Sequence, residues 1–227
     1  MREDEKPGLR RLPLFREMLT QTFDGLMQVA YAQIFPPQLE LFRQGQTADF
    51  LHIVVEGSVE LHAGWNGREV VMGVVRPVSP FILAACVRDV PYLMSARTLE
   101  RSRIVLLPAA DLRVAMRRDP DLAMAAMGEL AAGYRVMVRH AKNLKLRRAR
   151  ERLAAWILDQ ADGASCLKLP VEKRHLASYL GITAESLSRT IRSLEREGIK
   201  VDGARIIVTD AEKLKRVAQP DPLMDTP

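Results

Sequence analysis

The sequence predicts an α+β protein of two domains that are connected by a long helix. Three observations lead to this fold class. Short runs rich in Val, Ile and Leu, separated by glycine turns, occupy residues 38–107 and are typical of an antiparallel β-roll of the jelly-roll kind. A sustained heptad pattern follows, and two short amphipathic helices with a tight turn between them lie near the end. A chain of 227 residues is long enough to bury two separate cores.

Helices are expected before the strands, because residues 9–35 carry spaced apolar side chains, and Pro36 and Pro37 then interrupt the pattern. The strands are expected in the segments LELFRQGQ, FLHIVVEGSVELHA, REVVMGVV and RIVLLP. Asn66 and Gly67 stand between two of these segments and predict a hairpin turn.

The long helix is expected to begin at Asp119 and Pro120, because aspartate is a good N-cap and proline suits the first helical position. Its apolar residues recur every three or four positions, as in the seam of a coiled coil. Such a seam is best buried by a second copy of the helix, so the sequence predicts a parallel homodimer. The alternative is that the helix packs only onto the β-roll. The predicted dimer-interface residues are Met127, Leu130, Tyr134, Met137, Ala141 and Leu144.

Residues 175–199 predict two short helices around a turn. Gly181 suits the sharp turn because it has no side chain. Thr183 is a good N-cap for the second helix, which is expected to run from about Ala184 and to stop at Gly198. The apolar face of this helix consists of Leu187, Ile191 and Leu194.

The opposite face of the second helix carries polar side chains that can read base pairs. An arginine can donate two hydrogen bonds to guanine, a glutamate can accept one from cytosine, and a serine can contact either kind of edge. Many polar helix faces are merely solvated, but here the spacing, the caps and the composition agree, so a DNA-binding helix-turn-helix is the better interpretation. The predicted DNA-binding residues are Thr183, Glu185, Ser188, Arg189 and Arg192.

The segments around these helices complete the C-terminal domain. Residues 135–152 hold eight basic residues against one acid, a charge run that either flanks DNA or balances acids elsewhere. Residues 150–161 predict one more amphipathic helix, and Asp202 and Gly203 predict a hairpin turn that makes the domain winged. The polar, proline-rich tail is expected to be loose.

Composition restricts the functional class. The net charge of +6 and the pI of about 9.6 suit a polyanionic partner such as DNA. The sequence has neither a membrane-spanning apolar run nor a secretory signal, so a cytoplasmic protein is expected. Cys86 and Cys166 show no metal-ligand spacing, and no phosphate loop, paired-histidine metal motif or nucleophile elbow appears, so an enzyme is not expected.

The segment LFRQGQTADFLHIVVEGSVEL, residues 41–61, resembles the opening of the cyclic-nucleotide-binding domain in CRP/FNR transcriptional regulators, with the match at Gly45 and Gly57. Together with the helix-turn-helix, the resemblance covers nearly the whole chain. It implies double-stranded DNA and RNA polymerase as partners. It also implies four segments: N-terminal helices and a β-roll sensor domain (1–118), a dimerisation helix (119–145), a winged helix-turn-helix domain (146–219) and a flexible tail (220–227).

The run TAESLSR resembles the reading helix of the FNR branch of this family, whose pattern E-x-x-S-R reads a TTGA-type half-site. By position, Glu185, Ser188 and Arg189 take these roles. Arg192 is expected on a phosphate. Ala184 replaces an arginine that the cyclic-AMP branch uses, which favours TTGA over TGTGA. A homodimer on a palindromic TTGA-type site is therefore expected.

The resemblance also locates the positions at which cyclic AMP would be held. Relatives that bind it use a Gly-Glu pair for the ribose and an Arg-Ser pair for the phosphate. With Ser95 and Arg97 aligned, these four positions hold three aliphatic residues and a tyrosine. A buried cyclic phosphate without a cation would carry a large desolvation cost, so control by cyclic AMP is not expected. The residues expected to line an apolar effector pocket, or to fill a core, are Phe81, Ile82, Leu83, Tyr92 and Leu93.

Other sensors are weighed in the same way. An iron–sulfur cluster is not expected, because residues 1–85 contain no cysteine. A haem that senses nitric oxide or carbon monoxide is an open alternative, with His52, His62 and His140 as candidate axial ligands. Cys86 lies in an apolar run and is expected to be a core residue. The alternative function is a regulatory or scaffolding subunit whose β-roll binds another protein.

Overall fold

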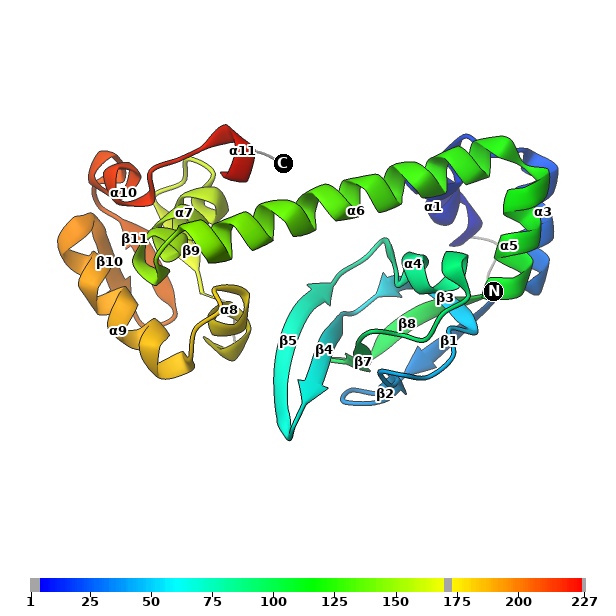
Figure 1. Ribbon diagram of the computed structural model, residues 1–227, viewed down its shortest axis with the longest axis horizontal. Helices are drawn as coiled ribbons and strands as arrows, with labels where there is room; N and C mark the ends of the chain where they lie inside the picture. Colours follow the sequence, from blue (N-terminus) through cyan, green and yellow to red (C-terminus); the bar gives the residue numbers. More distant parts are fainter. Residues whose placement is uncertain (1–4, 170–172, 226–227) are drawn as a thin grey trace. The chain divides into compact units, whose positions relative to one another are not determined.

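The computed structural model describes residues 5–169 and 173–225 and falls into two compact units, Met1–Gly133 and Tyr134–Pro227 (Figure 1). Each unit has its own hydrophobic core. The predicted fold class is confirmed, because antiparallel sheets form the first unit and a helix-turn-helix with a small sheet forms the second. The boundary between the units falls inside the long helix, whereas the sequence predicted boundaries near its two ends.

Helices precede the β-roll as predicted, but there are three in place of the one or two expected, and Leu14 and Phe15 are buried in the core of the first unit. The helices are α1 (Lys6–Arg10), α2 (Pro13–Arg16) and α3 (Thr20–Val29). The prediction of helix up to residue 35 is wrong at its end, because Tyr31–Phe35 form strand β1. This strand lies at a sheet edge and its side chains are mostly exposed, so the sequence carries no alternation that would reveal it.

The β-roll consists of two four-stranded antiparallel sheets with the orders β1-β8-β3-β6 and β2-β7-β4-β5. Every predicted segment contains a strand, but β6 and β7 were not predicted, because they have only three and four residues. The remaining strands are β2 (Glu40–Phe42), β3 (Phe50–Glu56), β4 (Val59–Trp65), β5 (Arg68–Val75), β6 (Ser79–Phe81), β7 (Ser95–Thr98) and β8 (Ser102–Pro108).

Two turns explain why glycine occupies its positions in this roll. Asn66 and Gly67 join β4 to β5 as a two-residue loop with φ values of 49° and 74°, as a primed hairpin turn requires, and the predicted hairpin is confirmed. At Gly57, φ is 83°, and an added Cβ would lie 2.4 Å from Ser102 Oγ. A larger residue at this turn would therefore clash as well as strain the backbone.

The long helix α6 (Pro120–Leu146) begins where the sequence predicted. Asp119 is fully buried, and its carboxylate accepts hydrogen bonds from the backbone N–H groups of Leu122, at 3.1 Å, and Leu19, at 2.8 Å. Burial acts to raise the pKa of Asp119, but these backbone hydrogen bonds lower it below its ordinary value. The cap therefore also ties the start of α3 to the start of α6. Two more helices, α4 (Leu83–Arg88) and α5 (Ala109–Arg118), complete the first unit.

The second unit packs its helices around Leu153, Ile157 and Leu194, which are fully buried. The predicted helix at residues 150–161 is present as α7. The elements are α7 (Ala149–Ala161), β9 (Cys166–Lys168), α8 (Lys173–Tyr179), α9 (Ala184–Leu194), the 3₁₀ helix η2 (Glu195–Glu197), β10 (Ile199–Asp202), β11 (Arg205–Val208), α10 (Ala211–Ala218) and α11 (Pro222–Asp225). The wing is a three-stranded sheet of order β10-β11-β9.

Two predictions for this unit need correction. The hairpin turn is one residue later than predicted, because Asp202 pairs with Arg205 and leaves Gly203 and Ala204 as the loop. The tail is not loose throughout, because helix α11 places Asp225 against Arg147. Residues 226 and 227 of that tail, residues 1–4 of the predicted sensor domain and residues 170–172 before α8 lie outside the described residues.

Candidate nucleic-acid interface and sensor core

Helices α8 and α9 form the predicted helix-turn-helix, with Gly181 in the turn at a φ of 62°. An added Cβ at Gly181 would lie 2.8 Å from Leu144 Cδ2, so a larger residue there is opposed by both backbone and packing. Thr183 caps α9, because its Oγ1 accepts from the backbone N–H of Ser186 at 3.1 Å. Both roles follow the sequence prediction.

The two faces of α9 separate as predicted. Leu187, Ile191 and Leu194 are buried in the core of the second unit. On the opposite side, Glu185 and Arg189 have side chains that are 80% and 68% exposed. Arg192 is also exposed, and Ser188 is half-buried with its Oγ donating to the carbonyl of Ala184 at 3.1 Å.

The contacts that hold Arg189 are weak. Its Nη1 lies 3.6 Å from Glu185 Oε1, and its Nη2 lies 3.3 Å from Ser186 Oγ, which sequence reasoning did not single out. An exposed ion pair of this kind contributes only about 0.3–0.5 kcal/mol. The guanidinium can therefore leave these neighbours for a base edge at little cost.

The basic run of residues 135–152, which extends into α7, is not one DNA-facing surface. Arg147 and Arg152 are buried. Arg147 donates from Nη2 to Asp225 Oδ2 at 2.6 Å, and this hydrogen bond raises the pKa of Arg147. Arg152 donates from Nε to the carbonyl of Leu180 at 2.9 Å and so braces the turn of the helix-turn-helix. Sequence reasoning missed these structural roles, because their partners are distant in the chain.

The predicted seam on α6 is mostly uncovered in a single chain. Met127, Tyr134 and Met137 are 53%, 71% and 56% exposed. Leu130 is half-buried and packs against the core of the first unit, where the buried α6 residues are Leu122 and Ala126. The seam therefore does not pack as a whole onto the β-roll.

The first unit contains a buried aromatic cluster, which consists of Phe42, His52, Phe81 and Tyr92. The ring centroids of Phe42 and Tyr92 are 3.9 Å apart, and those of His52 and Phe81 are 5.3 Å apart. The backbone carbonyl of Phe50 lies at its edge. This oxygen accepts from Tyr92 Oη at 3.0 Å and from Cys86 Sγ at 3.3 Å, and His52 Nδ1 lies 3.1 Å from it.

The five residues predicted to line an effector pocket, or to fill a core, differ in their surroundings. Phe81, Leu83 and Tyr92 are buried side chains of the core. Ile82 is half-buried and has a φ of 65° as the N-cap of α4. Leu93 is 82% exposed, so its assignment to a buried lining with the others is corrected.

The three candidate haem ligands lie in separate surroundings. His52 lies between Phe42 and Phe81, and burial lowers its pKa to about 4. His62 lies in a polar cluster on β4, and His140 contacts the ring of Tyr179 at 5.0 Å.

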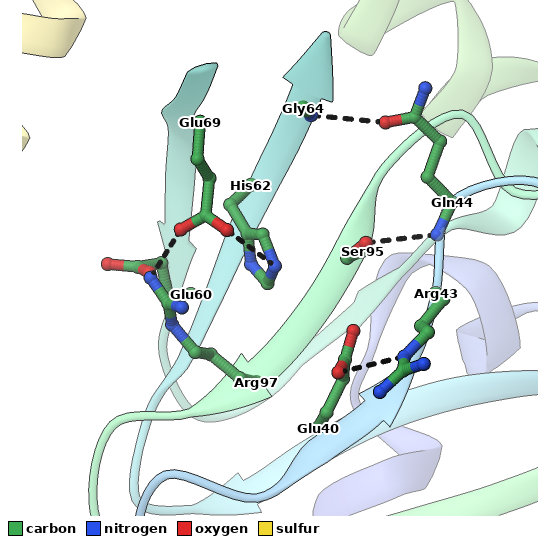
Figure 2. Close-up of polar contacts among 9 residues, drawn as sticks. All are labelled: Glu40, Arg43, Gln44, Glu60, His62, Gly64, Glu69, Ser95 and Arg97. Atoms are coloured by element: carbon green, nitrogen blue, oxygen red, sulfur yellow. Dashed lines mark hydrogen bonds and ion pairs between the residues drawn. The ribbon is translucent and has the colours of Figure 1, made fainter. Parts of the chain in front are cut away.

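Two other groups of the sensor unit, the thiol of Cys86 and the guanidinium of Arg97, already interact within the protein. Cys86 is buried as expected, and burial raises the pKa of its thiol to about 12, so it stays protonated. Arg97, a cation near the cyclic-AMP positions, donates to Glu60 and to Glu69 (Figure 2).

A β-roll with the architecture of a sensor and a capped helix-turn-helix with an exposed polar face together define a DNA-binding transcriptional regulator. Residues 32–119 match the family model of the cyclic nucleotide-binding domain, and residues 151–217 match that of the Crp-like helix-turn-helix domain. The chain belongs to the CRP/FNR family of transcriptional regulators. No helix in the described part of the chain is long and apolar enough to cross a membrane.

Relatives come from both branches of the family. The nitrogen fixation regulation protein FixK of Azorhizobium caulinodans is 26% identical over 195 residues, which cover 81% of this chain and 77% of that protein. The CRP-like cAMP-activated global transcriptional regulator of Mycobacterium tuberculosis is 22% identical over 220 residues, 93% of this chain and 98% of that protein. The structure of FixK2 from Bradyrhizobium japonicum superposes with a TM-score of 0.68 at 22% identity, covering 83% of this chain and 97% of that one.

Proposed function

We propose that the protein is a homodimeric regulator that binds a palindromic TTGA-type DNA site and does so without cyclic AMP. The observation that carries the proposal is the N-terminal half of α9, where Glu185 and Arg189 are exposed and only weakly held. Ser188, the remaining residue of the E-x-x-S-R pattern, lies on the same helix and is half-buried.

The seam on α6 supports the homodimer. An uncovered apolar stripe on a long helix is best buried against a second copy related by a two-fold axis. Two reading helices related by the same axis would then enter successive major grooves, about one helical turn of DNA apart. This geometry requires a palindromic site.

The filled β-roll supports independence from cyclic AMP. The positions that hold ribose and phosphate in cyclic-AMP-binding relatives are here a core leucine, a strained isoleucine, a stacked tyrosine and an exposed leucine. Arg97 is held by two carboxylates. A cyclic phosphate would therefore have to displace core side chains without gaining a cation.

The site of action follows from the proposal. A regulator that reads chromosomal DNA works in the cytoplasm of a bacterium, and RNA polymerase is its expected protein partner. Gas sensing through haem is not favoured, because the aromatic rings that flank His52 fill the space beside its imidazole. An enzymatic role is not part of the proposal.

The proposal is tested by comparing Arg189→Ala with Arg192→Ala on DNA duplexes that carry a TTGA palindrome or a scrambled sequence. Loss of a bidentate base contact weakens binding to the palindrome by about 1–3 kcal/mol and leaves the scrambled duplex nearly unaffected. Loss of a phosphate contact in Arg192→Ala weakens both duplexes alike and reduces the salt dependence. An Arg189→Ala variant that weakens both duplexes equally would contradict the assignment.

A further inference from the structure

A polar cluster lies on the β2-β7-β4-β5 sheet and includes none of the residues predicted to line an effector pocket. Glu60 and His62 belong to β4, Glu69 to the neighbouring β5 and Arg97 to β7 (Figure 2). One ligand atom from each of Glu60, His62 and Glu69 can be chosen so that all three lie within 4.8 Å of one another.

The sheet register brings these side chains to one face. Residues two apart on a strand share a face, which groups Glu60 with His62. Arg97 lies directly opposite Glu60 across the β4–β7 pair. Glu69 lies opposite Gly64, the next residue along β4 on the face of His62. The hairpin at Asn66 and Gly67 fixes this pairing, so the cluster is built into the fold.

The two carboxylates of the cluster share one guanidinium. Glu60 is fully buried, and a carboxylate in such a place needs a cation or hydrogen-bond donors. Arg97 donates to Oε1 of both carboxylates, at 2.9 Å in the case of Glu69.

His62 is the second and independent observation. His62 is only 6% exposed, and its Nδ1 is buried without a hydrogen-bond partner among the described residues. The Nε2 atom of His62 lies 3.7 Å from Glu69 Oε2, which is too long for a hydrogen bond. Arg97 donates to the other oxygen of this carboxylate, Oε1. Buried imidazole nitrogens normally have a partner, so a polar group or ion is expected at this place.

We propose that Glu60, His62 and Glu69 bind a divalent transition-metal ion of the zinc class. One imidazole and two carboxylates are ligands that Zn²⁺ accepts, whereas Mg²⁺ and Ca²⁺ prefer sites made only of oxygen. The ion gives the buried imidazole of His62 a partner. It also links β4 to β5 beyond their backbone hydrogen bonds. Arg97 stays as the counter-charge on the opposite oxygens of the two carboxylates.

The experiment uses the full chain with Cys166→Ser, because that exposed thiol would otherwise compete for zinc. The protein is stripped with EDTA and titrated with ZnCl₂ by calorimetry. We expect one Zn²⁺ per chain, and a loss of affinity of at least about tenfold in His62→Gln and in Glu69→Gln. Glu69 is half exposed, so Glu69→Gln stays folded, which circular dichroism verifies.

Glu40→Gln is the matched control. Glu40 lies on the same sheet opposite Arg97, but its carboxylate pairs with Arg43 at 3.0 Å and is not one of the three proposed ligands (Figure 2). Zinc affinity, and the rise in melting temperature that zinc produces, should be unchanged in this variant and reduced in the other two. The proposal is overturned if the folded protein takes up no stoichiometric zinc, or if either His62→Gln or Glu69→Gln retains the affinity of the parent within about twofold.

Discussion

The reading face of α9 and the interior of the β-roll are both places where members of this family meet ligands, yet they are built in opposite ways. On α9, Glu185 and Arg189 are exposed and their mutual contact is long. In the β-roll, Tyr92 and His52 are buried, stacked and hydrogen bonded to one backbone carbonyl. The polar side chains of α9 are thus accessible to a binding partner, whereas those of the β-roll interior are buried and already have a partner within the protein. This contrast is what the proposed function uses: an exposed face for DNA and a buried aromatic cluster in the β-roll.

The largest expected effect is on assembly. Tyr134→Glu combined with Met137→Glu changes only exposed side chains of a single chain, so the fold of each unit should be unaffected. In a dimer the two charges would be buried without partners, at a cost of about 3 kcal/mol or more. We expect the double variant to sediment as a monomer and to lose palindrome binding.

The control for this variant is Val136→Glu, which changes an exposed apolar residue of α6 that lies off the predicted seam. It should sediment as the parent does. A double variant that remains dimeric would show that the seam is not the interface.

The second prediction concerns the two positions at which relatives hold the cyclic phosphate. Tyr92→Ala removes a stacked ring and a hydrogen bond to Phe50 and should destabilise the first unit by about 3–5 kcal/mol. Leu93→Ala, on the neighbouring exposed residue, should change stability by less than about 0.5 kcal/mol. Urea unfolding of both variants measures this contrast. Similar losses in the two would mean that both side chains share a pocket.

The third prediction uses pH to examine the filled core. Burial lowers the pKa of His52 from 6.5 to about 4, so its neutral form stabilises the fold above pH 6.5. As the pH falls from 6.5 to about 4, the unfolded chain takes up a proton that His52 in the folded chain does not, and about 3 kcal/mol of stability is lost. Denaturant unfolding between pH 7 and pH 4 should therefore show a steeper loss for the parent than for His52→Phe. If the stability of the parent and of His52→Phe fell equally between pH 7 and pH 4, His52 would be in contact with water.

The sequence predicted features whose signals are local. The N-caps Asp119 and Thr183, the hairpin at Asn66 and the apolar face of α9 each follow from residues within one or two turns of the chain. Strand β1 was missed because an exposed edge strand shows no alternation, and helix α11 because Asp225 depends on the distant Arg147.

The interior of the sensor could not be predicted in the same way. The convergence of Tyr92, Cys86 and His52 on the carbonyl of Phe50 depends on how strands and helices far apart in sequence are placed. The cluster of Glu60, His62 and Glu69 depends on the register of β4 with β5. Sequence spacing identifies such residues only as isolated polar groups, because register is a property of the folded sheet.

The measurement that tests the account most directly is the affinity of the purified protein for a TTGA palindrome, determined by fluorescence anisotropy with and without cyclic AMP at one fixed salt concentration. The account predicts specific binding in the absence of nucleotide and the same affinity in its presence. An affinity that rises by about tenfold or more when cyclic AMP is added would mean that the nucleotide prefers the DNA-binding state. That result would contradict the proposal that the protein acts without cyclic AMP.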